Sequence, residues 1–254
     1  MKNFILDISY DGNHYSGWQR QKNKRSVQGT IEKVLKKILK EKKASLTSAS
    51  RTDAGAHAVH QIANFKLSKG PFLKPEPLLK ALNAVLPSDI RINSLRSARA
   101  DFHARYWAKK REYHYLIYNH KINSPFYQKY AYYYPKSIDL NLLRKTLSYF
   151  KGRHDFAPFA NLSKTNVKTT VRTLYQISYK KKGPLITIIL KGDGFLKGMI
   201  RNIIGSVLAI NKLKQNPSLI KEIFRLQKRT KERLIDKSGS TVPAYGLYLY
   251  RVYY

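Results

Sequence analysis

The chain has 254 residues, 43% of them hydrophobic, which is enough to bury a substantial core. Its 49 Lys and Arg against 15 Asp and Glu give a formal net charge of +34, and so large a positive excess indicates a polyanionic partner such as a nucleic acid. The sequence contains no cysteine, which excludes disulfides, thiolate catalysis and cysteine-based zinc sites. A basic protein whose charge only reflects general lysine usage is the alternative interpretation.

Neither a signal peptide nor a membrane span is expected. Asp7 interrupts the apolar residues at the N-terminus, and the longest apolar stretch, around 199–210, contains Arg201. We therefore expect a soluble intracellular protein, located in the cytoplasm and without membrane contact.

Hydrophobic periodicity predicts a β-α-β-β-α-β order for the first half of the chain, which is the ferredoxin-like arrangement. In the first helix, apolar residues recur at helical spacing from Val27 to Leu39, with lysines on the opposite side. The expected elements are strands at 3–10, 45–50, 59–66 and 90–98 and helices at 27–39 and 78–86, the second of which stops at Pro87.

The second half is predicted to have a similar ferredoxin-like order of strands and helices, with additional elements. The expected elements are strands at 111–119, 170–181, 185–191 and 248–253 and helices at 140–150, about 195–212 and about 218–230. Ser137 is the expected cap of the helix at 140–150. We predict two domains: residues 1–104, a ferredoxin-like half with the Asp53 loop, and residues 105–254, a second ferredoxin-like half with extra helices.

The segment at 50–57 joins two predicted strands and carries Asp53. Loops held by rigid strands often carry catalytic groups. Gly55, between two alanines, leaves little bulk beside the carboxylate, so a substrate has room to approach. Taken alone, an aspartate in such a loop is more often a turn residue or a surface ion-pair partner, and a catalytic role for Asp53 depends on its companions.

Arg201 is the first candidate companion of Asp53. It lies three residues after Gly198 and four before Gly205, which gives its guanidinium room to meet another segment. A buried guanidinium requires an anion, and Asp53 is a plausible one, since the pairing would keep its carboxylate ionised. In the alternative, the glycines only permit tight helix packing and Arg201 reaches solvent.

Basic and aromatic residues are interleaved at 105–115, a pattern suited to binding phosphates and stacking bases. Arg105, Arg111 and Tyr113 belong to this segment, although aromatic residues also favour strands because they pack well on sheets. His57 and His60 look like metal ligands, but on a strand they point to opposite faces and no cysteine completes a zinc set. We expect both histidines to be structural or to contact phosphate, and no metal site.

Across these and other segments the chain resembles the tRNA pseudouridine synthase A (TruA) family, nearly end to end. The segments that carry the resemblance are YDG (10–12), GWQR (17–20), VQG (27–29), SRTDAG (50–55), DFHAR (101–105), REY (111–113), GRHDF (152–156), RT (172–173), the stretch 194–205 and PAYGL (243–247). The chain departs from the family pattern at Ser50, where Gly is frequent, at Ala56, where Val is common, and at Gly198, where a larger residue often sits. These positions bear on substrate preference more than on activity.

The resemblance implies an α+β fold in which two ferredoxin-like halves form one extended, mostly antiparallel sheet with a central catalytic cleft. It also implies a homodimer that acts on uridines 38, 39 and 40 of the tRNA anticodon stem-loop, without metal or other cofactor. Position by position, Asp53 matches the catalytic aspartate, Arg201 its arginine partner and Tyr113 the tyrosine that stacks on the target base. Arg51 matches the arginine two residues before the aspartate. The remaining candidates for substrate binding are Arg105, Arg111 and His57.

The implied reaction breaks the N1–C1′ bond of uridine, turns the uracil and rejoins it through C5. Because no redox change or net hydrolysis occurs, neither NAD nor a metal-activated water is required. The aspartate either acts covalently, at the base or at the ribose, or removes the C2′ proton so that a glycal forms. In each route the base must first leave the helical stack.

The residue patterns leave two other classes of protein open. One is a non-catalytic RNA-binding protein or RNA chaperone that uses the same basic aromatic surfaces. The other is a metal-dependent nuclease or deaminase, from which the isomerase would differ by activity that survives EDTA.

Overall fold

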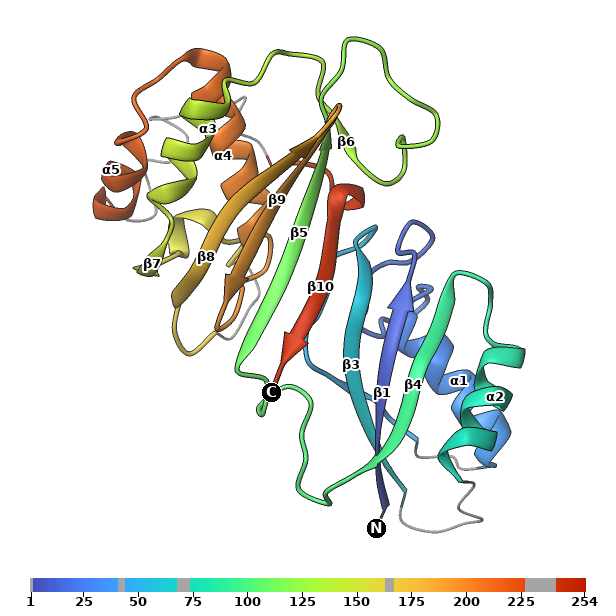
Figure 1. Cartoon of the computed structure of the whole chain (residues 1–254). Helices are drawn as coiled ribbons and strands as arrows, with labels where there is room; N and C mark the ends of the chain where they lie inside the picture. The colour runs from blue at the N-terminus through green and yellow to red at the C-terminus, as the bar shows by residue number, and fades with distance from the viewer. Residues whose placement is uncertain (1, 41–43, 68–73, 163–166, 227–240) are drawn as a thin grey trace. The chain divides into compact units, whose positions relative to one another are not determined.

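A computed structural model of the whole chain describes residues 2–40, 44–67, 74–162, 167–226 and 241–254 (Figure 1). The chain divides into two compact units, residues 1–111 with 248–254, and residues 112–247. This division differs from the expected domains 1–104 and 105–254, because the boundary falls later and the last strand belongs to the first unit. The expected α+β fold with mostly antiparallel strands is confirmed.

The first unit is built on a sheet with the strand order β4-β1-β3-β10. The strands are β1 (Lys2–Tyr10), β3 (His57–Leu67), β4 (Ile90–Ala98) and β10 (Leu247–Tyr253). β1 runs antiparallel to both β3 and β4, whereas β10 runs parallel to β3. Figure 1 shows α1 (Val27–Leu39) and α2 (Pro75–Val85) side by side against one face of this sheet.

Local sequence explains where the first helix begins and which face it buries. Ser26 caps α1, since its side chain accepts the backbone N–H of Gly29 at 3.3 Å. Val27, Ile31 and Leu35 lie on one face of the helix and are fully buried, as their spacing predicts. The helix therefore covers the sheet with its apolar side and leaves lysines outward.

The outer edge of β3 is shared by two strands. The strand expected at 45–50 is reduced to β2 (Thr47–Ser48), which pairs with Ala63 and Asn64 of β3. β10 pairs with the opposite end of β3, at His57 and Ala58. After β2, the N–H of Ala49 still donates to the carbonyl of Ile62 on β3 at 2.8 Å, and residues 50–56 then form the loop that carries Asp53.

The second unit has a sheet with the order β5-β9-β8-β7, and the short strand β6 pairs with β5. Its elements are β5 (Lys110–Tyr118), β6 (Tyr132–Tyr133), α3 (Leu140–Ser148), β7 (Gly152–Asp155), β8 (Val171–Lys182), β9 (Leu185–Gly192), α4 (Met199–Leu213) and α5 (Leu219–Leu226). The expected strands at 111–119, 170–181 and 185–191 are confirmed to within one residue at each end. α3 and α4 pack together, and Figure 1 shows them with α5 on one side of the sheet.

One expected helix cap and one expected helix start are wrong. Ser137 does not cap α3, because Asp139 does so by accepting the N–H groups of Asn141 and Leu142 at 2.9 and 3.0 Å. The helix expected from about 195 begins at Met199, because Gly198 adopts a left-handed conformation with φ of 72° that cannot continue a helix. The expected residues 227–230 of the last helix lie outside the described residues.

Within the described ranges, no helix has both the length and the apolar character that a membrane crossing requires.

Candidate active site

The loop that carries Asp53 is fixed to the sheet of the first unit through two residues that precede Asp53. The fully buried amide of Gln61, on β3, brackets Ser50 by accepting its N–H at 3.2 Å and donating to its carbonyl at 2.8 Å. The hydroxyl of Thr52 lies 2.7 Å from that of Tyr10, on β1. Asp53 itself is partly exposed. A backbone with little freedom therefore carries this partly exposed residue.

A second segment, residues 12–18, lies against the same loop. The N–H of Trp18 donates to the carbonyl of Thr52 at 3.2 Å, and the N–H of Gly55 donates to the carbonyl of Tyr15, also at 3.2 Å. Gly17 has φ of +91°, and a Cβ there would lie 2.7 Å from the carbonyl oxygen of Thr52. The contact therefore needs glycine, both for the backbone conformation and for the close approach.

Residue patterns alone gave no indication that the segment at 12–18 supports the loop. The signal that points to it is the pair of glycine-containing segments, YDG and GWQR, within the family resemblance. A Cβ on Gly12 would overlap the carbonyl group of Ala56, so this glycine too is required by close packing.

His57 is buried where the loop joins β3. Its Nδ1 accepts the N–H of Gly12 at 3.1 Å, and its ring stacks on that of Tyr248 with centroids 4.6 Å apart. Only 2% of the residue is exposed. The structure thus gives His57 a packing role, and its contact with substrate stays a prediction.

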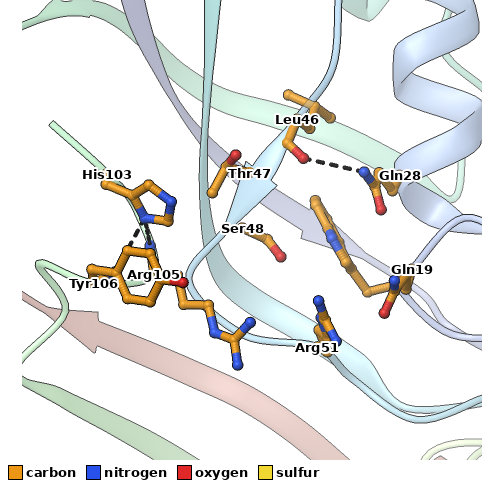
Figure 2. A pocket seen from close by; sticks show the side chains of 10 residues that line it. Gln19, Gln28, Leu46, Thr47, Ser48, Arg51, His103, Arg105 and Tyr106 are labelled. Atoms are coloured by element: carbon orange, nitrogen blue, oxygen red, sulfur yellow. Dashed lines mark hydrogen bonds between the residues drawn. The ribbon is translucent and has the colours of Figure 1, made fainter. Parts of the chain in front are cut away.

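Arg51 and Arg105 line one pocket of about 190 Å³ in the first unit (Figure 2). Both are exposed, and their guanidinium groups lie at the same side of the pocket in the view of Figure 2. Arg105 comes from the segment before β5, and Arg51 from the loop that carries Asp53. Two cations therefore line one pocket next to the loop that carries Asp53, which suits a phosphate-bearing substrate.

Arg111 instead binds the protein itself. Its guanidinium donates to the carbonyl oxygens of Ala49 at 3.1 Å, Arg105 at 2.7 Å and Ala108 at 3.0 Å. This cation therefore ties the start of the Asp53 loop to the segment that carries Arg105. Its predicted contact with RNA stays a prediction.

Tyr113 and Arg201 both belong to the second unit. Tyr113, on β5, is 4% exposed and meets the ring of Phe195 edge-on, with centroids 5.1 Å apart. Arg201 lies in the first turn of α4, and its Nε donates to the carbonyl of Val242 at 2.7 Å. Asp53 belongs to the first unit, so its pairing with Arg201 and its proximity to Tyr113 stay predictions.

A buried tyrosine lies beside Arg201. Burial raises the pKa of Tyr115 well above its usual range, and the positive charge of Arg201 opposes this shift. The Tyr115 hydroxyl remains protonated and donates to the carbonyl of Pro243 at 2.9 Å. Residue patterns missed Phe195 and Tyr115 as neighbours of the candidate site, although Phe195 and Pro243 lie in segments that carry the resemblance.

Among the described residues, no group of three or more His, Cys, Asp or Glu side chains is placed to hold a metal ion.

Comparison with known proteins identifies close relatives. The family model described as tRNA pseudouridine synthase matches residues 8–107 and 147–254. The protein called tRNA pseudouridine synthase A in Caldicellulosiruptor bescii is 41% identical over 254 residues, which cover 100% of both chains. Its counterpart in Acetivibrio thermocellus is 40% identical with the same coverage. That of Geobacillus kaustophilus is 40% identical over 97% of this chain and 92% of the relative.

Proposed function

The chain belongs to the tRNA pseudouridine synthase family, and on that premise we propose that it converts uridines 38, 39 and 40 of the tRNA anticodon stem-loop to pseudouridine, with Asp53 as the essential catalytic group. Membership makes the protein an isomerase that acts on tRNA, and favours this class over a non-catalytic RNA-binding protein. The catalytic role proposed for Asp53 is supported by the loop in which it lies. Hydrogen bonds at Ser50, Thr52 and Gly55 hold the backbone, while the carboxylate between them is partly exposed.

The proposed chemistry needs one carboxylate at the sugar–base junction. The N1–C1′ bond breaks, the uracil rotates and a C5–C1′ bond forms, after which the proton on C5 is lost and N1 ends protonated. Asp53 either forms a transient bond to the base or the ribose, or takes the C2′ proton. A carboxylate on a fixed backbone serves each route, because its position is set before the substrate arrives.

The remaining residues have binding roles in this proposal. The target base leaves the stack at a cost of a few kcal/mol and is held against Tyr113. Arg201 neutralises the Asp53 carboxylate, while Arg51 and Arg105 bind phosphates. The net charge of +34 adds a long-range attraction for tRNA.

Replacement of the carboxylate tests the central claim. We expect Asp53→Asn to abolish tritium release from tRNA labelled at C5 of uridine, while tRNA affinity changes less than about threefold, or roughly 0.7 kcal/mol. Glu76→Gln is the matched control, since it makes the same chemical change at an exposed ion pair with Lys80 on α2. Turnover near that of wild type in Asp53→Asn would reject the essential role. Carbodiimide mapping of treated transcripts then identifies which uridines are modified.

We propose further that the protein is a homodimer and acts in the cytoplasm, as the family resemblance implies. Light scattering coupled to size-exclusion chromatography tests the first point, with a mass twice the 29.5 kDa of the chain expected. A monomer at the concentrations that support full activity would contradict it.

A further inference from the structure

The pocket beside the Asp53 loop contains an aromatic pair that the proposed chemistry leaves unused. Trp18 and Leu46 give it buried apolar walls, and Tyr106 stands at its rim next to His103 (Figure 2). All of these residues belong to the first unit. The pocket is therefore complete within that unit.

Tyr106 stacks on His103 and stays exposed. The ring centroids are 4.2 Å apart with an angle of 25° between the planes, and Tyr106 is 77% exposed. One face of the tyrosine is covered by the imidazole, so the exposed area includes the opposite face. An exposed ring already supported on one side is suited to stack on a further flat group such as a nucleobase.

The backbone that carries this pair is held firmly. Nδ1 of His103 accepts the N–H groups of Arg105 and Tyr106, each at 3.2 Å, as Figure 2 shows. The Ala104 N–H donates to Asn64 at 2.9 Å, and Arg111 donates to the carbonyl of Arg105. The exposed position of Tyr106 is thus set by the fold rather than by a free loop, which lowers the entropy lost when a ligand binds.

The charge at the pocket fits a phosphate. Arg51 and Arg105 both line it, and none of its lining residues is acidic. A nucleotide presents a flat base and a phosphate one sugar apart, which matches a ring beside two guanidinium groups.

Two of the polar side chains that line the pocket, Gln28 and Ser48, are engaged with the protein. Gln28 donates from Nε2 to the Leu46 carbonyl at 3.1 Å and to Glu32 at 2.9 Å, and its Oε1 accepts the Arg20 N–H at 3.1 Å. Ser48 donates to the Ser50 carbonyl at 2.9 Å. Gln28 and Ser48 are therefore not available to read the edge of a base, and we expect stacking and charge to contribute most of the binding, so that base identity matters little.

We propose that this pocket binds a nucleotide adjacent to the target uridine, with its base stacked on Tyr106 and its phosphate held by Arg51 and Arg105. The inference rests on the proposed function for the identity of the RNA. Arg51 precedes Asp53 by two residues, which span at most about 7 Å of backbone, so the pocket lies within reach of the neighbouring nucleotides.

A chemical double-mutant cycle tests this stacking. Anticodon stem-loops, each with one abasic site at a different position, are titrated into Asp53→Asn protein with and without Tyr106→Ala, and binding is followed by fluorescence anisotropy. We expect one abasic site beside the target to weaken binding about 5- to 100-fold when Tyr106 is present, the range for loss of one base–aromatic stack. In the Tyr106→Ala background the same site should weaken binding less than about twofold, because the stack is already lost.

Two further variants separate stacking from general effects. Tyr106→Phe keeps the ring, so the abasic site should weaken binding by the same factor as with Tyr106 present; this loss of affinity is the abasic penalty. Tyr175→Ala removes a tyrosine that is 44% exposed on β8, and should leave the penalty as in wild type. Equal abasic penalties with and without Tyr106, at every position scanned, would overturn the proposal. Exchange of the neighbouring base for any of the other three should change affinity less than the abasic site does.

Failure here is distinguishable from failure of the proposed function. These titrations use protein that lacks the Asp53 carboxylate and measure binding alone. Tritium release by the wild-type protein tests the isomerisation separately, so an additive cycle with normal turnover would reject only the nucleotide pocket.

Discussion

Gln61 holds Ser50 through both of its amide atoms, with distances of 2.8 and 3.2 Å, from a fully buried position on β3. We expect Gln61→Leu, which keeps most of the side-chain volume, to leave the N–H and carbonyl of Ser50 without these partners. The Ser50 carbonyl keeps its bond from the Ser48 hydroxyl, so the cost is that of two lost hydrogen bonds, about 0.5–1.5 kcal/mol each. The free energy of unfolding should fall by that order in urea titrations, and kcat should fall about tenfold or more because Asp53 is less well positioned.

Gln176→Leu is the control for that change. Gln176 is an exposed glutamine on β8 that contacts Ser178 at 3.3 Å. Its replacement should alter the free energy of unfolding by less than about 0.5 kcal/mol. A normal kcat in Gln61→Leu would show that the two hydrogen bonds between Gln61 and Ser50 do not position the Asp53 carboxylate.

Gly17→Ala should disturb the same loop from the other side. The position has φ of +91°, and the added Cβ would lie 2.7 Å from the Thr52 carbonyl oxygen. Gly183→Ala is a matched comparison, since φ there is +55° and no atom lies within 4 Å of the added Cβ. The left-handed conformation alone costs about 1–2 kcal/mol, so both variants should lose that much stability. Only Gly17→Ala should also lose turnover, because its added Cβ displaces the Asp53 loop. Comparable kcat values in Gly17→Ala and Gly183→Ala would contradict this expectation.

Much of the fold was predictable because its elements carry local signals. Helix α1 repeats its apolar positions and has a serine cap, and helix α2 ends just before Pro87. β2 was expected to be longer, because 45–50 is strand-like by composition. β2 pairs with β3 only at Ala63 and Asn64, and the backbone of Ser50 is bound by the side chain of Gln61 instead of by a strand partner. No local sequence pattern shows that a side chain on β3 takes this place.

The candidate site divides in the same way. Asp53 was found from the loop between two strands and from the family resemblance, both of which the sequence displays. Other features of the site depend on how the chain folds around the loop. These are the hydrogen bonds from Gln61 to Ser50, the close approach of Gly17 and the three carbonyl contacts of Arg111. Residue type alone does not predict such contacts, since glutamine and arginine are ordinarily surface residues.

Arg111 was predicted to bind substrate, and its contacts allow a sharp test. A phosphate contact contributes about 0.7–0.9 to the slope of log affinity against log salt concentration. Because the Arg111 guanidinium donates to three backbone carbonyls, we expect Arg111→Ala to lower the melting temperature and leave that slope unchanged. Arg51→Ala should do the reverse, flattening the slope by one contact with little change in melting temperature. A flatter slope in Arg111→Ala would assign it a direct contact with RNA.

Tyr15 makes the stability of the protein depend on pH. Burial raises its pKa to about 12, helped by donation of its hydroxyl to Asp89 at 2.6 Å, whereas Arg25 opposes the shift. Between the ordinary tyrosine pKa of about 10 and the folded value, the unfolded chain has lost a proton that the folded protein keeps. The contribution of Tyr15 is therefore complete below about pH 10 and declines as the pH rises towards 12.

Urea unfolding from pH 8 to 11.5 measures this decline. Tyr15→Phe removes the titrating hydroxyl, so its free energy of unfolding should fall less steeply above about pH 10 than that of wild type. Tyr175→Phe, at an exposed position on β8, should retain the wild-type steepness. Identical pH dependence in wild type and Tyr15→Phe would show that the hydroxyl does not titrate differently on folding.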